Sequence, residues 1–413
     1  MLIRSRLILP RILFLLLIAW SCASSSSSQT SQRKYINPAG DEFPIIAWES
    51  FGNSKNITIQ NFRNMKIAGF NISLALMGDM NLTYKALEVA KKTGMKIIAD
   101  CPQTKNPDSI PVYLPKIRNN EALAGYYVTD EPQKKHFEEV KKKCDLIYKY
   151  DSIHLPVITL LPMALNPNQT KIQEYRNYLS DFNRIVNLPY FSFDNYPIKS
   201  ENGKTYVKDN FYTNLEIASE VSRKSERPFW AFCLSAAHFN YPTPTKAALQ
   251  LEAFSALAYG AQALCYYTYI LVDSQSIKYS IAPVTQTGAR TKVWYLCRNN
   301  NILIQNLKSV FLGCEVQNVW HTGKNLPVGT KRLNKMPGPF ISLKSEDEGV
   351  LVSHIKNKGK NYLVVVSHDI LKPQTVEIAK KDNVKRVGNK GNLIADNNSN
   401  FSLEPGGFLI FSW

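Results

Sequence analysis

The fold is decided by a repeated unit whose clearest copy reads LAGYYVTDEP at residues 123–132, followed by HFEEVKKKCDLIYKY at residues 136–150. The first segment is a short apolar run rich in aromatic residues and ends in two carboxylates, which is typical of a buried β-strand that leads into a loop. The second segment repeats its apolar residues with the spacing of an amphipathic helix. Together they predict one βα unit.

Seven further copies of this unit flank it along the chain. The predicted strands span residues 44–48, 71–76, 96–100, 124–128, 156–160, 190–193, 229–233 and 263–267. Helix patterns lie between them, and Gly94 ends the pattern at residues 82–93 where a helix C-cap is expected. Eight βα units in this order predict an α/β protein with a (β/α)8 TIM barrel. A doubly wound sheet is the alternative, but no G-x-G-x-x-G follows the first strand, so its dinucleotide-binding form loses its main support.

A different pattern follows the eighth strand. Residues 291–312 predict one more amphipathic helix, and short runs of alternating hydrophobicity come after it. The runs occupy residues 349–355, 361–366, 374–378 and 407–411. Glycine, asparagine, aspartate and lysine turns separate them, so we expect a small antiparallel β-sandwich over residues 334–413 and a barrel over residues 41–333.

The first 40 residues are predicted to lie outside the barrel. Residues 1–22 hold three arginines and an apolar run that is too short to span a bilayer, which is typical of a signal peptide. The sequence AWSC at its end, followed by a serine tract, resembles a bacterial lipobox with Cys22 as the lipidated residue. We therefore expect export, a flexible tether at residues 23–40, and attachment to the outer membrane through the lipid alone. A plain secretory signal is the alternative, which the bulky Trp20 favours.

The chain is strongly basic. Its net charge is +17 at pH 7, since 50 lysines and arginines outnumber 33 aspartates and glutamates. The lysines are spread along helix-like segments and do not interleave with aromatic residues, so we expect no nucleic-acid partner. A solvated surface is our first interpretation of the charge. An acidic glycan substrate, or attraction to an anionic membrane surface, is the alternative.

Six cysteines follow Cys22, and none of them forms a C-x-x-C pair. They are Cys101, Cys144, Cys233, Cys265, Cys297 and Cys314. Three lie in or beside apolar strand runs, which favours buried thiols over disulfides. No set of histidines, cysteines and carboxylates has metal-ligand spacing, and no G-x-S-x-G elbow is present. We therefore expect no metal site, no cofactor and no serine hydrolase.

Polar and aromatic residues gather where the predicted strands end, which is where the chemistry of a TIM barrel is confined. The residues that we predict to bind substrate are Trp48, Glu49, Asp100, Asp130, Tyr196, Trp230, His238 and Tyr267. Sugars present flat C–H faces fringed by hydroxyls, so carboxylates interleaved with aromatic rings predict a carbohydrate substrate. For His238 a structural hydrogen bond, and for Asp100 the anchoring of a loop, are the alternatives.

Glu131 is the first candidate for catalysis. Glycoside hydrolysis needs one carboxyl that is protonated to assist the leaving group and a second that is ionised as nucleophile or base. Glu131 ends the fourth strand, and repulsion from the neighbouring Asp130 is expected to raise one of the two pKa values. The alternative is that Asp130, Glu131 and Pro132 merely begin the next helix.

Asp194 is predicted to be the second carboxylate. It ends the sixth strand, two positions along the barrel from Glu131, and is therefore expected to face it across the mouth. Glu49 is the next candidate. Glu252 is the third, although its place in a helix pattern at residues 245–259 agrees equally well with a solvent-facing or capping role.

Four segments, read in order, resemble bacterial β-galactosidase-like glycoside hydrolases related to clan A. They are LAGYYVTDEP at residues 123–132, SFDNYPI at residues 192–198, PFWAF at residues 228–232 and FSALAYGA at residues 254–261. The resemblance runs from about residue 43 to the C-terminus and includes the closing β domain. It implies a (β/α)8 barrel with O-glycosyl hydrolase activity and no cofactor.

The resemblance also assigns roles. In clan A the acid/base glutamate ends strand four, which places that role on Glu131. The nucleophile is a glutamate at the end of strand seven, but residues 232–238 read FCLSAAH here and hold no carboxylate. Either another residue such as Asp194 takes this role, with a retaining or an inverting mechanism, or the barrel is a non-catalytic carbohydrate-binding lipoprotein.

Overall fold

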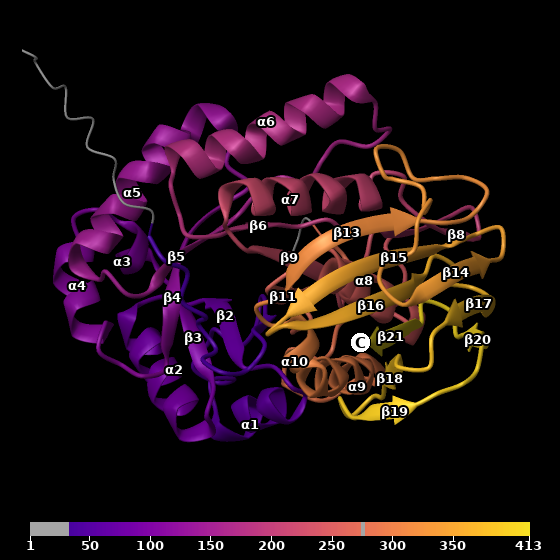
Figure 1. Cartoon of the computed structure of the whole chain (residues 1–413). Coiled ribbons are helices and arrows are strands. Elements are labelled where there is room, and N and C mark those ends of the chain that lie inside the picture. Colours follow the sequence, from indigo (N-terminus) through magenta and orange to yellow (C-terminus); the bar gives the residue numbers. More distant parts are fainter. Residues whose placement is uncertain (1–32, 274–276) are drawn as a thin grey trace, which may run out of the picture. The chain divides into compact units, whose positions relative to one another are not determined.

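The computed structural model describes residues 33–273 and 277–413, whose arrangement is drawn in Figure 1. The predicted signal peptide and most of the predicted tether, Cys22 included, lie outside the described residues. No helix in the described ranges is long and apolar enough to cross a bilayer. All six cysteines within those ranges are free thiols, and every one except Cys314 is buried.

Eight parallel strands form a closed barrel. In chain order they are β1 (Ile45–Ala47), β2 (Ile72–Leu76), β3 (Lys96–Asp100), β4 (Leu123–Asp130), β5 (Leu155–Thr159), β6 (Phe191–Phe193), β9 (Phe229–Leu234) and β11 (Ala263–Tyr267). Their order in the sheet is β5-β4-β3-β2-β1-β11-β9-β6. A parallel bridge joins Leu160 to Phe193, and the Leu160 N–H donates to the Ser192 carbonyl at 2.8 Å, which closes the ring. The predicted TIM barrel is confirmed.

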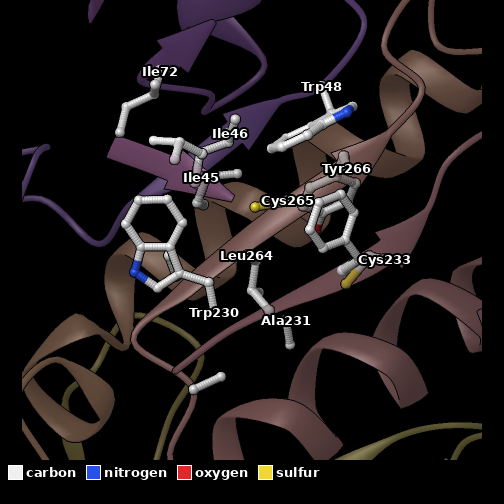
Figure 2. Close-up of a cluster of buried hydrophobic side chains, with 14 of the residues drawn as sticks. Ile45, Ile46, Trp48, Ile72, Trp230, Ala231, Cys233, Leu264, Cys265 and Tyr266 are labelled. Atoms are coloured by element: carbon white, nitrogen blue, oxygen red, sulfur yellow. The ribbon is translucent and has the colours of Figure 1, made fainter. Parts of the chain in front are cut away.

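The barrel strands are apolar because helices cover their outer face while side chains fill the interior. β1, β5, β6 and β9 are buried at every residue. Figure 2 shows part of this core, with Ile45 of β1 beside Leu264 and Cys265 of β11. The same strands carry their next residues to the open end, where Trp48 directly follows β1.

Helices surround the barrel strands. They are α1 (Ile59–Ile67), α2 (Met80–Thr93), α3 (Pro102–Lys105), α4 (Ile110–Ile117), η1 (Lys134–His136), α5 (Phe137–Tyr150), α6 (Gln169–Ile185), α7 (Phe211–Ser225), α8 (Lys246–Ala258), α9 (Lys292–Asn306) and α10 (Lys308–Phe311). Side-chain caps fix where several begin: Asp79 accepts from the Leu82 N–H, and Thr245 accepts from the Ala248 N–H. The helix predicted at residues 291–312 is divided into two at Leu307.

Two short antiparallel strand pairs lie at the mouth of the barrel. β7 (Ile198–Glu201) and β8 (Lys204–Val207) form a hairpin directly after β6, and β10 (Ala237–His238) pairs with β12 (Tyr279–Ile281). The hairpin turns at Asn202 and Gly203, whose φ values of 51° and 73° are those of a two-residue turn that needs left-handed backbone at both positions.

The C-terminal strands form a sandwich of two antiparallel sheets. They are β13 (Glu315–His321), β14 (Phe340–Ser345), β15 (Val350–Asn357), β16 (Lys360–Ser367), β17 (Gln374–Lys380), β18 (Lys385–Val387), β19 (Leu393–Ala395), β20 (Asn400–Leu403) and β21 (Phe408–Ser412). One sheet has the order β13-β15-β16-β21-β18-β19 and the other β14-β17-β20. Val352 and Leu363 of the first sheet pack against Val376 and Ile378 of the second, so the predicted sandwich is confirmed.

The larger sheet also packs on the barrel helices. The Ser353 hydroxyl donates to the Ala258 carbonyl at the end of α8, and the Phe254 and Phe408 rings stack with their centroids 3.6 Å apart. The Asn357 amide donates to three carbonyls around α10. This sheet begins with β13, which lies before the boundary that we predicted at residue 334. β13 was not predicted, because its residues lack the strict alternation of apolar and polar side chains that indicated the predicted strands.

Candidate active site

A cavity of about 480 Å³ opens at the C-terminal ends of the barrel strands. It is lined by Trp48, Asp130, Glu131, Thr159, Pro162, Asp194, Asn195, Tyr196, Lys199, Lys208, Phe232, His238, Phe239, Tyr241 and Tyr267. Seven of the ten predicted catalytic and binding residues are among them. A larger cavity of about 810 Å³ lies beside Pro228 and Gln262, which precede β9 and β11. That is the N-terminal end of the strands, where TIM barrels do not carry their chemistry.

Glu131 and Asp194 form a pair of carboxyls in this cavity. Glu131 follows β4, with its N–H donating to the Thr159 carbonyl at 2.8 Å, and Asp194 follows β6. Burial and the charge of Glu131 raise the pKa of Asp194 well above its usual range, and the two side chains are hydrogen-bonded to each other. In the described chain no N–H or O–H group donates to Asp194 Oδ1. A hydrogen bond between two carboxyls needs a proton from one of them, and the raised pKa of Asp194 favours its protonated form.

Three more carboxyls stand beside the pair. Partial burial and the charge of Glu131 raise the pKa of Asp130 to about 6, although the Tyr127 hydroxyl donates to it. Asp100 is buried and paired with Lys105 at 2.6 Å, so it acts here as an anchor and does not line the cavity. Burial and the charges of Asp100 and Asp130 raise the pKa of Glu49, which follows β1 just outside the lining.

Unpartnered polar atoms also face the cavity. Asn195 is 4% exposed, and neither its Oδ1 nor its Nδ2 has a hydrogen-bond partner in the described protein. The same is true of Thr159 Oγ1. Buried amides and hydroxyls are nearly always hydrogen-bonded, so these atoms are suited to the hydroxyls of a bound sugar.

Aromatic rings form the cavity walls. Tyr196 and Tyr267 stack with their centroids 5.6 Å apart, and Tyr241 stands edge-on to Tyr196 at 6.0 Å. Phe232 contacts Tyr196 at 6.4 Å and also packs edge-on against Trp48 at 4.9 Å. Such rings offer flat apolar surfaces to the C–H faces of a sugar.

His238 lies on the same wall and is buried. Its Nδ1 is 3.2 Å from the Ala236 carbonyl, which can only accept, so Nδ1 carries the hydrogen. Burial, assisted by the charge of Lys199, lowers the pKa of His238. The neutral ring therefore presents Nε2 as an acceptor. The structural hydrogen bond is present and the ring lines the cavity, and a contact of His238 with substrate stays a prediction.

Trp230 was predicted to bind substrate, and that prediction is wrong. It is the second residue of β9, so it lies at the N-terminal end of the barrel, away from the mouth. Its side chain is 1% exposed, stacks on Tyr190 at 4.3 Å and donates to the Tyr35 hydroxyl at 3.1 Å. Figure 2 shows Trp230 and Trp48 on opposite sides of Cys265.

The end of strand seven carries no carboxylate of its own. Ser235 follows β9, and its hydroxyl donates to the Thr268 carbonyl at 3.0 Å. Glu252 reaches this place from α8 and accepts the Leu234 N–H at 2.6 Å. Burial raises the pKa of Glu252 to about 8. The Glu252 side chain does not line the cavity. Its hydrogen bond holds the end of β9 in place.

Sequence reasoning missed the two lysines of the site. Lys199 lies in β7 and Lys208 directly follows β8, so both stand at the base of the hairpin. Asn202 and Gly203 between two runs of strand-forming residues were the available signal, since Asn-Gly is the strongest short marker of a hairpin. Asn195 belongs to the segment SFDNYPI, but no role was predicted for it.

No group of three or more histidine, cysteine or acidic side chains is placed to hold a metal ion within residues 33–273 and 277–413. The polar side chains of the described site are carboxylates, tyrosines and lysines together with Asn195, Thr159 and His238. A barrel mouth with a proton-sharing carboxyl pair between aromatic walls is the arrangement of a glycoside hydrolase.

The comparisons with known proteins agree with this class. Residues 127–305 match the Glyco_hydro_42 family, which is described as Beta-galactosidase. This match confirms the predicted resemblance of the barrel to β-galactosidase-like glycosidases. No curated protein matches the chain.

Solved structures share the fold at low identity. The β-galactosidase from the psychrophilic Marinomonas ef1 is 9% identical with a TM-score of 0.50, and the match covers 65% of this chain and 60% of that one. The chain thus spans less than two thirds of that enzyme. A family 39 glycoside hydrolase from the gut symbiont Bacteroides cellulosilyticus WH2 is 9% identical with a TM-score of 0.55, and 91% and 82% are covered. The β-galactosidase from Bacillus circulans sp. alkalophilus is 10% identical with a TM-score of 0.51, and 90% and 99% are covered.

Proposed function

We propose that the protein hydrolyses glycosidic bonds in an oligosaccharide or polysaccharide, with Glu131 as general acid/base and Asp194 as the second carboxylate. The family match suggests a β-galactoside as the sugar. The observation that carries the proposal is the hydrogen-bonded pair of Glu131 and Asp194 inside a cavity with tyrosine walls. Two carboxyls with one proton are the composition that the reaction requires.

The proton distribution follows from the surroundings. Asp194 is largely enclosed and holds the proton in the free site, while Glu131 is reached by solvent and lies nearer the cavity opening. Transfer of the proton across the hydrogen bond from Asp194 to Glu131 produces a protonated general acid and an ionised second carboxylate in one step. Glu131 can then protonate the glycosidic oxygen while Asp194 supports the developing positive charge on the sugar ring.

Sugar binding must part the two carboxyls. In retaining enzymes the pair is about 5 to 5.5 Å apart and in inverting enzymes about 6.5 to 9.5 Å, both wider than a hydrogen bond. The anomeric configuration of the first product, followed by NMR during hydrolysis of a β-galactoside, decides between the two. Net retention assigns Asp194 as a nucleophile, and inversion assigns it as a base that activates water.

Glu131→Gln tests the proposal. The amide keeps the size of the side chain but cannot donate the proton, so kcat on an aryl β-galactoside is expected to fall about 100-fold to 10,000-fold. Sugar binding, measured by calorimetry, is expected to stay within a factor of a few. Glu121→Gln is the matched control, since it makes the same change at the opposite end of β4. A Glu131→Gln variant that hydrolyses like the unaltered protein refutes the assignment.

A second candidate function is binding without hydrolysis. It is favoured by the absence of a carboxylate at residues 232–238, where clan A carries its nucleophile. An unaltered protein that binds galactosides but releases no product from a panel of aryl glycosides and glycans supports this alternative.

We also propose that the chain is exported and anchored to the outer membrane by a lipid on Cys22, as its sequence context suggests. Cys22→Ser is expected to move the protein from the membrane fraction to the soluble fraction. Retention in the membrane fraction contradicts the anchor.

A further inference from the structure

Two lysines share one face of the hairpin at the edge of the cavity. Lys199 stands opposite Tyr206 in the register, and cross-strand partners point to the same face. Lys208 is two residues beyond Tyr206 and so lies on that face as well. Its N–H donates to the Pro197 carbonyl at 2.7 Å, which extends the ladder and holds Lys208 diagonally across from Lys199. Both side chains line the cavity.

The surroundings of Lys199 are already filled. Its ammonium donates to Asn240 Oδ1 and lies over the Tyr241 ring, 3.7 Å from the centroid. Asn240 in turn donates to Glu201. Lys199 is therefore fixed in place, with its positive charge directed along the cavity wall.

Lys208 has no such partners. Among the described residues, no carboxylate lies within ion-pair distance of its ammonium and no acceptor is hydrogen-bonded to it. Burial and the charge of Lys199 lower the pKa of Lys208 to about 8. A half-buried cation that faces another cation is unfavourable unless an anion completes the arrangement.

The carboxyls of the site do not supply that anion. Asp194 attracts Lys208 only from beyond ion-pair distance, and the raised pKa of Asp194 weakens that attraction in the free site. Glu252 attracts Lys208 from beneath but is itself buried, with a pKa of about 8. Asp209 is exposed and also attracts Lys208 only from beyond ion-pair distance, so a neutral galactoside would leave the ammonium of Lys208 without an ion-pair partner.

We propose that the cavity binds a sugar with an anionic substituent, a carboxylate or a sulfate ester, whose charge is received by Lys208 with support from Lys199. The inference rests on the proposed function, because it names the substrate class of the same site. The carboxyl pair and Asn195 hold the neutral part of the sugar, and the base of the hairpin holds the charged part. The strongly basic chain favours the approach of such polyanionic glycans.

Calorimetric binding to the full chain carrying Glu131→Gln tests this without turnover. Three ligands are compared: methyl β-D-galactopyranoside, its 6-sulfate and methyl β-D-galactopyranosiduronate. At least one anionic ligand is expected to bind about tenfold to a hundredfold more tightly than the neutral one, the worth of one charge-assisted hydrogen bond. Which anionic ligand gains affinity separates a sulfate ester from a carboxylate.

Adding Lys208→Gln is expected to remove that gain and to leave the neutral ligand within about twofold. Lys208→Arg is expected to restore most of it, and this variant guards against a mere folding defect. Lys204→Gln, on the same hairpin but exposed and outside the cavity lining, is the matched control. Equal affinity for all three ligands, or equal weakening of all three by Lys208→Gln, overturns the inference. Because binding is measured in a variant that cannot turn over, a failure of hydrolysis in the unaltered protein counts only against the proposed function.

Discussion

Glu131 combines its chemical role with an uncommon backbone conformation. Its φ is 43°, and Glu49 at the end of β1 has a φ of 49°. Residues with a Cβ are disfavoured there by about 1 to 2 kcal/mol, so such positions persist where the surrounding structure fixes them and often where function needs them. At Glu131 the hydrogen bond to the Thr159 carbonyl does so. The position of the proposed catalytic carboxyl is thus fixed at a cost in stability.

Exchanging Glu131 for glycine and for alanine separates these two effects. Both variants are expected to lose hydrolysis, but Glu131→Gly relieves the left-handed backbone and Glu131→Ala does not. Glycine is expected to be more stable than alanine by about 1 kcal/mol, measured by denaturant unfolding. At an ordinary helix position the order is reversed, so an alanine variant as stable as the glycine variant contradicts the strained backbone.

Glu252 links pH to stability. Its pKa is raised from 4.5 to about 8 by burial, against the smaller lowering effects of the Leu234 N–H and of Lys208. In the unfolded chain it ionises at the lower value, so between the two the unfolded state holds fewer protons than the folded state. The free energy of unfolding therefore decreases as pH rises from about 4.5 to about 8, by an amount on the order of 5 kcal/mol from this group.

Glu252→Gln is expected to abolish this decrease, because the amide accepts the Leu234 N–H without a charge to bury. Guanidinium unfolding at pH 5 and at pH 8 measures the difference between the two proteins. The free energy of unfolding of the variant is expected to exceed that of the unaltered protein at pH 8. At pH 5 the two free energies are expected to be more similar. Glu174→Gln on the exposed side of α6 is the control. If the free energy of unfolding of the variant changes between pH 5 and pH 8 as much as that of the unaltered protein, Glu252 is not a buried acid with a raised pKa.

The predicted site residues that line the cavity share one property, their position after a strand. Asp130, Glu131, Asp194 and Tyr196 follow runs whose periodicity fixes where a strand ends. Trp230 was misplaced because its ring chemistry was weighed without its position near the start of the run. The protonation of Asp194 could not be predicted, since it depends on enclosure by residues far apart in sequence.

At the scale of elements, helix ends follow local rules closely enough to be tested. Gly94 caps α2 with a φ of 68°, and no other atom lies within 4 Å of the position where its Cβ would be. The cost of Gly94→Ala is therefore a backbone cost alone, about 1 kcal/mol in the free energy of unfolding. Gly94→Asn is expected to cost less, since asparagine tolerates this conformation. Equal losses for the two would contradict the left-handed cap.

The β7–β8 hairpin is the element that the predicted strand and helix pattern omits. A search for βα units passes over it, because residues 198–207 lie where a helix was expected to follow β6. The turn at Asn202 and Gly203 follows a local rule and was readable. The sequence could not predict that the base of this hairpin brings Lys199 and Lys208 to the cavity. That position depends on contacts with Pro197 and Asn240.

At the scale of the whole described chain, one buried hydrophobic cluster extends from the barrel to the larger sheet of the sandwich. Leu351, Ile355 and Val364 of the larger sheet belong to the same buried cluster as the barrel strands. The sheet also caps the ends of helices through Ser353 and Asn357. A boundary at residue 334 therefore divides two architectures that are joined by one buried cluster, while a second cluster lies between the two sheets of the sandwich.

One cooperative unfolding transition is the expected consequence. Because neither part can lose the shared cluster alone, the calorimetric and van't Hoff enthalpies of thermal unfolding are expected to agree for the full chain. Phe408→Ala, which removes the ring stacked on Phe254, is expected to lower the midpoint of that single transition without splitting it. Two resolved transitions in the unaltered protein would show that the parts unfold independently.

Trp48 and Trp230 lie at opposite ends of the barrel, and because of this separation tryptophan fluorescence can follow ligand binding. Trp48 lines the cavity, so a sugar that enters changes the polarity around its indole ring. Trp230 is 1% exposed and out of reach of any ligand at the mouth. The emission of Trp48 reports occupancy, while Trp230 and the other tryptophans of the chain supply the background, and Trp48→Phe removes the signal. A fluorescence titration can thus follow ligands that leave no coloured product, without any label attached to the protein.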